Sequence, residues 1–200
     1  MIDYDIKNVK EIFARLFVIA NQNETNLTAF TRGLASSDFV KKIEADKYDD
    51  YFNKPIIEIF ESTITSYISE DKSFGVFNDA YWSGISYFDL HLKTHKPFSY
   101  IFLKLPFEKM IDIYDVYHEM DFSSLYEYFQ KLEKEKTILR LLCEQNHKSL
   151  SKISKATSIS INTLSKYNAS DEALYKASFQ NIVKIAKYFD VPISLFIGKL

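Results

Sequence analysis

The sequence predicts an all-α fold made of two helical domains, residues 1–133 and 134–200. Apolar residues recur at the three- and four-residue spacing of amphipathic helices through most of the chain. Serine, asparagine and proline residues stand where such helices would begin. Charge sets the boundary, because residues 1–133 hold 14 Lys and Arg against 22 Asp and Glu, whereas residues 134–200 hold 11 against 5.

The first half of the N-terminal domain is expected to hold three helices. One covers residues 9–22, where apolar residues follow helical spacing. The second begins after Asn26, which can act as its N-cap, and is interrupted near residues 33–37. The third carries Pro55 in its first turn, where the missing N–H has no helical partner, and its apolar face continues to Ile68.

The second half of this domain is expected to hold three more helices. One begins at Asn78 and ends before Pro97, because a residue that precedes proline avoids the helical region. Residues 98–105 fit either a short strand or a continued helix. Pro106 opens the next helix, and Asp121 caps a long one that reaches the second domain without a flexible linker.

Residues 149–168 have the capping and apolar spacing of two short helices joined by a tight turn. Ser149 can cap the first helix, in which Ile153 and Ala156 are expected to face inward. Ser160 can cap the second helix. Apolar residues before and after this pair of helices supply the core that two short helices lack by themselves.

The second helix of the pair is expected to have a polar and basic outer face. Leu164 packs inward, while the residues that point away are Asn162, Thr163, Ser165 and Lys166. Asparagine can pair with adenine, and serine or threonine can reach base edges or phosphates. This face therefore fits the major groove of double-stranded DNA.

Residues 136–198 resemble the helix-turn-helix regulators of phage-repressor and Cro type, also called the XRE family, with Asp190-Val191-Pro192 at the turn before the last helix. The resemblance implies a five-helix, lambda-repressor-like DNA-binding domain. It places Ser149 and Lys152 at the DNA backbone. It places in the groove Ser160, Ile161, Asn162, Thr163 and Lys166.

The chain departs from the family pattern at several positions. Ser158 stands where a turn glycine is usual, Leu150 where a phosphate-contacting glutamine is common, and Asn168 where a glutamate usually follows. The loop at residues 169–177 is also longer than is typical of the family. These departures change the contact surface and leave the core signature intact.

The resemblance implies a sequence-specific transcriptional regulator, most simply a repressor, that binds a pseudo-palindromic operator as a homodimer. Another possible function is that of an interaction protein in which the helix-turn-helix no longer binds DNA.

The alternative function is that of an antitoxin. The segment Tyr81-Trp82-Ser83-Gly84, taken with Tyr117, His118 and their neighbours, is similar to a segment of bacterial antitoxins. The acidic domain would then bind a basic toxin while the basic domain represses the shared operon. Residues 1–133 also hold 26 of the 32 aromatic residues, which form either a core or an interface. The interface candidates are Tyr81, Trp82, Tyr117 and His118.

Other classes of protein are disfavoured. The single cysteine, Cys143, allows no disulfide and no cysteine-based zinc site within one chain, and the four glycines form no phosphate-binding loop. His91 and His95 are four residues apart with Asp89 nearby, yet no third metal ligand is recognisable. The sequence therefore predicts a chain that is no enzyme and takes no cofactor or metal.

The chain is also expected to be cytoplasmic and to have no membrane partner. Its first residues lack the basic and apolar segments of a signal peptide. No apolar run approaches the about 18 residues that a membrane-spanning helix needs.

Overall fold

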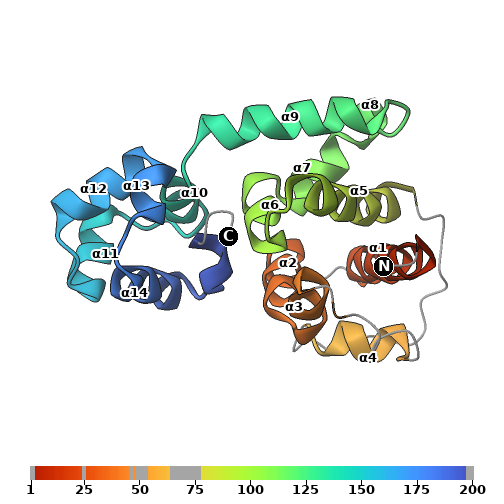
Figure 1. The fold of residues 1–200 in the computed structure, drawn as a ribbon, viewed down its shortest axis with the longest axis horizontal. Helices are drawn as coiled ribbons and strands as arrows, with labels where there is room; N and C mark the ends of the chain where they lie inside the picture. The colour runs from red at the N-terminus through yellow and green to blue at the C-terminus, as the bar shows by residue number, and fades with distance from the viewer. Residues whose placement is uncertain (1–2, 24–25, 46, 48–53, 64–77, 197–200) are drawn as a thin grey trace. The chain divides into compact units, whose positions relative to one another are not determined.

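The computed structural model describes residues 3–23, 26–45, 47, 54–63 and 78–196 (Figure 1). Within these ranges the chain forms helices joined by turns and no β-strand, which confirms the all-α class. The chain divides into two compact units, residues 1–125 and 126–200, so the division falls inside a helix, α9 (Phe122–Glu135). The charge pattern had placed it after residue 133.

The N-terminal unit holds eight described helices before α9. They are α1 (Asp3–Gln22), α2 (Leu27–Ser36), α3 (Asp38–Glu44), α4 (Ile56–Glu61), α5 (Asn78–Thr94), α6 (Phe98–Lys104), α7 (Phe107–Asp112) and α8 (Tyr114–Tyr117). The side chain of Asn26 accepts a hydrogen bond from the Ala29 amide at 2.8 Å, which confirms its capping role.

Several boundaries differ from the sequence-based expectation. The interruption near residues 33–37 lies at Ser37 alone, whose hydroxyl caps α3 by accepting from the Val40 amide. The alternative left open at residues 98–105 is decided in favour of helix. Pro55 and Pro106 each stand one position before a helix, as the N-cap residue, rather than in its first turn. The expected apolar positions at Ile64 and Ile68 lie outside the described residues.

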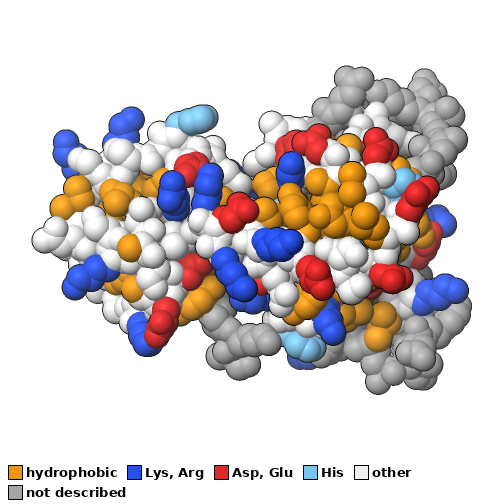
Figure 2. Space-filling model, turned by 90° about the horizontal axis from the view of Figure 1, so that it is seen from above, with side chains coloured by type: hydrophobic (Ala, Val, Ile, Leu, Met, Phe, Trp, Pro, Cys, Tyr) orange, Lys and Arg blue, Asp and Glu red, His pale blue; other side chains and the backbone are white. Residues whose placement is uncertain are grey.

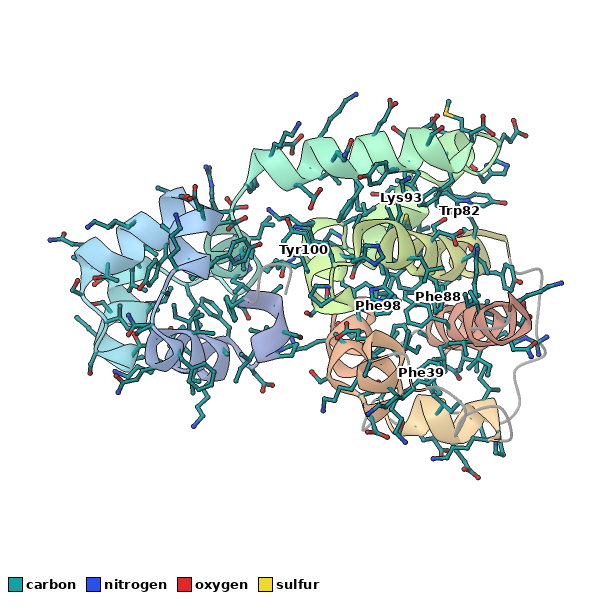
Figure 3. All side chains as sticks on the ribbon, in the orientation of Figure 1. Phe39, Trp82, Phe88, Lys93, Phe98 and Tyr100 are labelled. Atoms are coloured by element: carbon teal, nitrogen blue, oxygen red, sulfur yellow. The ribbon has the colours of Figure 1, made fainter. Side chains whose placement is uncertain are left out.

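Phenylalanine and tyrosine rings fill the centre of the N-terminal unit, where α1 packs along α5 (Figure 3). The ring of Phe13 lies 4.6 Å from that of Phe98, centroid to centroid. Phe17 lies 5.2 Å from Tyr87 and 4.8 Å from Phe107. All five side chains are buried, so these aromatic residues form part of the core of the unit.

Three polar contacts link distant segments of this unit. Glu44 at the end of α3 accepts a hydrogen bond at 2.7 Å from the backbone N–H of Phe98, the first residue of α6. Lys10 of α1 pairs with Asp89 of α5, with 2.6 Å between Nζ and Oδ1. The Tyr87 hydroxyl, fully buried, donates to the Leu105 carbonyl at 2.8 Å.

Over the described residues after α9, up to residue 196, the C-terminal unit contains five α-helices and a short 3-10 helix. They are α10 (Ile138–Gln145), α11 (Leu150–Thr157), α12 (Ile161–Ala169), α13 (Asp171–Tyr175), α14 (Phe179–Phe189) and η2 (Ile193–Phe196). The expected loop at residues 169–177 is thus wrong over residues 171–175. Ser170 caps α13 through the Ala173 amide, and the Asp171 carboxylate accepts from the Ile138 N–H at 2.7 Å.

Candidate nucleic-acid interface

A tight turn joins α11 to α12. Ser158 has φ 57°, in the left-handed region, and its N–H donates to the Ser154 carbonyl at 2.9 Å. The Thr157 hydroxyl donates to the Ile153 carbonyl at 2.7 Å and accepts from the Ile159 N–H at 3.3 Å. The Ser154 hydroxyl donates to the Ile159 carbonyl at 2.7 Å. Side-chain hydroxyls thus satisfy the backbone groups that the turn would leave unpaired.

The predicted serine caps are present on both helices. The Ser149 hydroxyl accepts from the Lys152 N–H at 3.3 Å, and the Ser160 hydroxyl accepts from the Thr163 N–H at 3.1 Å. The Ser160 and Thr163 hydroxyl oxygens are also 2.8 Å apart. These bonds fix where α12 begins and how its first turn is oriented.

The inner side of α12 is tied to the rest of the unit. Leu164 is fully buried, and Tyr167 is 8% exposed. The Tyr167 hydroxyl accepts a hydrogen bond at 3.1 Å from the Asn181 side chain in α14. The Thr137 hydroxyl, ahead of α10, donates to the Asn168 carbonyl at 2.9 Å. Since α12 also packs against α10, α11 and α13, the rest of the unit holds it in one orientation.

The outer side of α12 is open to solvent. Its exposed residues are Ile161, Asn162, Ser165 and Lys166, with the cap Ser160 also exposed and Thr163 half-buried. Ser149 and Lys152, the two positions expected at the DNA backbone, are exposed as well. Figure 2 shows Lys and Arg side chains on the visible face of the C-terminal unit, with hydrophobic and a few acidic side chains between them.

One inward position on α11 was predicted wrongly. Ala156 is exposed, and the neighbouring Thr157 is 6% exposed. Thr157 lies four residues after the buried Ile153, so both share one helix face. Burial of Thr157 is tolerated because its hydroxyl donates to the Ile153 carbonyl and accepts from the Ile159 N–H.

The lysines of α11 and α12 form no ion pairs among the described residues, in contrast to Lys136, Arg140 and Lys176 of the same unit. Lys136 and Arg140 both pair with Glu144, at 2.6 and 3.2 Å, and these contacts lower the pKa of the Glu144 carboxyl. Across the part of the chain that the structure describes, the lysines without an ion pair include Lys152, Lys155 and Lys166. Their charge is therefore available to an anionic partner.

The interface candidates of the N-terminal unit have neighbours within that unit. Tyr81 is half-buried, and its hydroxyl donates to Glu11, which raises the tyrosine pKa. Trp82 meets Tyr114 edge to face at 5.6 Å between centroids. The His118 ring stacks on Tyr114 at 4.2 Å. Trp82 and His118 thus both contact Tyr114, while the Tyr81 hydroxyl bonds to Glu11.

A group of exposed apolar and acidic residues beside Tyr117 was not predicted from the sequence. Val116 and Met120 are 55% and 50% exposed, and Tyr117 beside them is half-buried. The neighbouring carboxylates of Asp112, Asp115 and Glu119 are all exposed. We call these six residues the acidic apolar surface. The signal in the sequence was two apolar residues spaced four apart between acidic ones.

Two of the residues considered as metal ligands, His91 and Asp89, contact other groups. The His91 ring stacks on Phe98 at 4.4 Å between centroids, and its Nδ1 lies 2.7 Å from the Lys96 carbonyl oxygen. Asp89 pairs with Lys10. Among the described residues no three His, Cys, Asp or Glu side chains gather as metal ligands would.

Comparison with known proteins found no matching family model, no matching curated protein and no matching solved structure. Among the described residues, no helix has both the length and the apolar character needed to cross a membrane.

Proposed function

We propose that this chain is a sequence-specific DNA-binding regulator that inserts α12 into the major groove. The observation that carries the proposal is the contrast between the two sides of α12. Leu164 and Tyr167 anchor it from behind, while Asn162, Ser165 and Lys166 stand free in front. A short helix with this division can present hydrogen-bonding groups to base edges without loss of its own packing.

Charge supports the same orientation. Lys152 and Lys155 of α11, like Lys166, carry no ion pair among the described residues and can approach phosphates beside the groove. Asn162 is exposed, and an asparagine amide can pair with an adenine through both of its groups. In the proposed role of repressor, two copies bind half-sites about 34 Å apart on a pseudo-palindromic operator.

Selection of bound sites from random duplexes, carried out with the full chain, tests the proposal. We expect one enriched palindrome. Asn162→Ala and Lys166→Glu should each strongly reduce enrichment, because they remove a base contact and a groove-side charge. Lys187→Glu is the matched control, since it changes the same charge on an exposed residue of α14 and should leave enrichment intact. Equal effects of Lys166→Glu and Lys187→Glu would indicate nonspecific attraction, and absence of enrichment would contradict the proposal.

The acidic apolar surface favours a second candidate function, binding of a basic protein by the N-terminal unit, as in an antitoxin that also represses its own operon. A second copy of the chain is the less suitable occupant, because it would bring like carboxylates together. Binding of a basic amphipathic peptide, measured by calorimetry, should weaken with Met120→Ser. The matched control, Leu92→Ser, changes an exposed leucine of α5 and should have no effect.

A further inference from the structure

We propose that Ile161 reads the 5-methyl group of a pyrimidine in the operator, so that one thymine in each half-site is recognised by its methyl. This inference rests on the proposed function. It adds that an apolar contact, besides the amide of Asn162, determines sequence preference. It also predicts that 5-methylcytosine is favoured over cytosine where this contact falls.

The exposure of Ile161 carries the inference. Its side chain is 48% exposed, although isoleucine is among the residues most often buried. Over the described residues of the C-terminal unit, only Phe179 of α14 is another large apolar residue exposed to this degree. Leu164 and Tyr167 supply the buried side of α12, while about half of the Ile161 side chain is left open to a partner.

The position of Ile161 determines what it can meet. It is the first residue of α12, directly after the cap Ser160 and before the exposed Asn162. Residues at the start of a recognition helix are the ones that reach base edges. An isoleucine placed there loses water on binding and needs an apolar surface in return.

The major groove offers few apolar surfaces of this kind. Base pairs present hydrogen-bond donors and acceptors there, and the C5-methyl group of thymine is the apolar exception. 5-Methylcytosine places the same methyl at the same carbon. An aliphatic side chain at the groove floor therefore distinguishes methylated from unmethylated pyrimidines, whereas the Ser160 hydroxyl and the Asn162 amide beside Ile161 do not.

Substitution of single atoms in DNA tests this assignment on the full chain. The duplex from the site selection is remade with each thymine replaced in turn by uracil, which removes only the methyl group. We expect affinity to fall about three- to tenfold at one position of each half-site, the effect of one buried methyl group. At the same position, a C·G pair should gain affinity by a similar factor when its cytosine is methylated at C5.

The protein side of the test is Ile161→Ala. This exposed residue can be shortened without a cavity, and alanine favours the helix. The variant should bind thymine and uracil duplexes equally at that position. Ser165→Ala, a matched change on the same helix, should keep the preference for thymine.

The outcomes are distinct. If a duplex is selected and no uracil substitution alters binding, or if the preference survives Ile161→Ala, this inference is wrong and the proposed function stands. If no duplex is selected, both are wrong.

Discussion

Gly84 in α5 lies directly against the backbone of Ala14 in α1. A Cβ atom placed on Gly84 would stand 2.5 Å from the Ala14 Cα and 3.1 Å from Cδ2 of Phe17. Because the nearest atom belongs to the backbone, it cannot turn aside as the end of a flexible side chain could. The absence of a side chain at residue 84 therefore sets how closely α1 and α5 approach.

Gly84→Ala should lower the free energy of unfolding. The added methyl pushes α1 from α5 and disturbs the aromatic core, at a cost of about 1–3 kcal/mol. This exceeds the helix-propensity gain of about 1 kcal/mol that alanine brings. Urea unfolding followed by circular dichroism measures the difference. Gly33→Ala, at a half-exposed position inside α2, is the control and should be neutral or stabilising.

Ser158→Gly should instead raise the free energy of unfolding. Ser158 holds φ 57°, a conformation that is costly for residues with a Cβ and free for glycine. After the greater flexibility of glycine in the unfolded chain is subtracted, we expect a gain of about 0.5–1 kcal/mol. Thermal unfolding measures it. Ser151→Gly, at an exposed position of regular helix in α11, should instead cost about 0.5 kcal/mol.

Features that depend on a few adjacent residues were predictable from the sequence. The caps at Asn26, Ser149 and Ser160 follow from one side chain and an amide three residues away. The outer face of α12 was predictable for the same reason, because helical spacing fixes which residues oppose Leu164.

Features that depend on distant partners were not predictable. Every residue of α6 is buried, so its sequence shows no amphipathic period to separate helix from strand. The short α13 is held by the bond from Ile138 N–H to Asp171, 33 residues away. The contact of Gly84 with Ala14 likewise cannot be recognised in the sequence, because no residue close to either one indicates that the two will be neighbours.

Substitution of Glu44 by alanine should lower the free energy of unfolding more than substitution by glutamine. The Glu44 carboxylate caps the N-terminus of α6 through the Phe98 N–H. Glu44→Ala leaves that N–H without its partner and should cost about 1–3 kcal/mol. Glu44→Gln keeps an acceptor oxygen and removes the charge, so it should retain most of the stability at neutral pH. Urea unfolding of the three proteins at pH 7 compares these effects, and equal losses in the two variants would argue against the capping role.

The same residue should contribute to the pH dependence of stability. Burial raises the pKa of the Glu44 carboxyl above its usual 4.5, and the bond from Phe98 opposes this only in part. The folded chain therefore holds this proton more tightly than the unfolded chain. The stabilisation is complete below pH 4.5 and declines as the pH rises through the folded-state pKa. Unfolding measured from pH 4 to 7 should show this decline in the natural chain and lack it in Glu44→Gln.

Tyr87→Phe should destabilise the N-terminal unit without altering its packing. The change deletes only the hydroxyl group. The Leu105 carbonyl, which accepts the hydrogen bond from this hydroxyl, would then be buried without a partner. The expected loss is about 1–3 kcal/mol. Tyr114→Phe, at a half-buried tyrosine, serves as control and should fall within about 0.5 kcal/mol of the natural chain. Chemical unfolding measures both, and similar values for the two would mean that the buried hydrogen bond adds little.

Lys152 and Asn162 should affect DNA binding in different ways. Lys152 is exposed on α11 and forms no ion pair among the described residues, so in the proposed complex it meets a phosphate. Lys152→Ala should weaken binding to all sequences alike, and the slope of log affinity against log salt should become shallower by about 1. Asn162→Ala should leave this slope unchanged and cost about 1–3 kcal/mol on the selected site alone. Titrations at several salt concentrations, on the selected and on a scrambled duplex, separate the two. If Asn162→Ala lowered affinity equally on both duplexes, its side chain would not be a reader of bases.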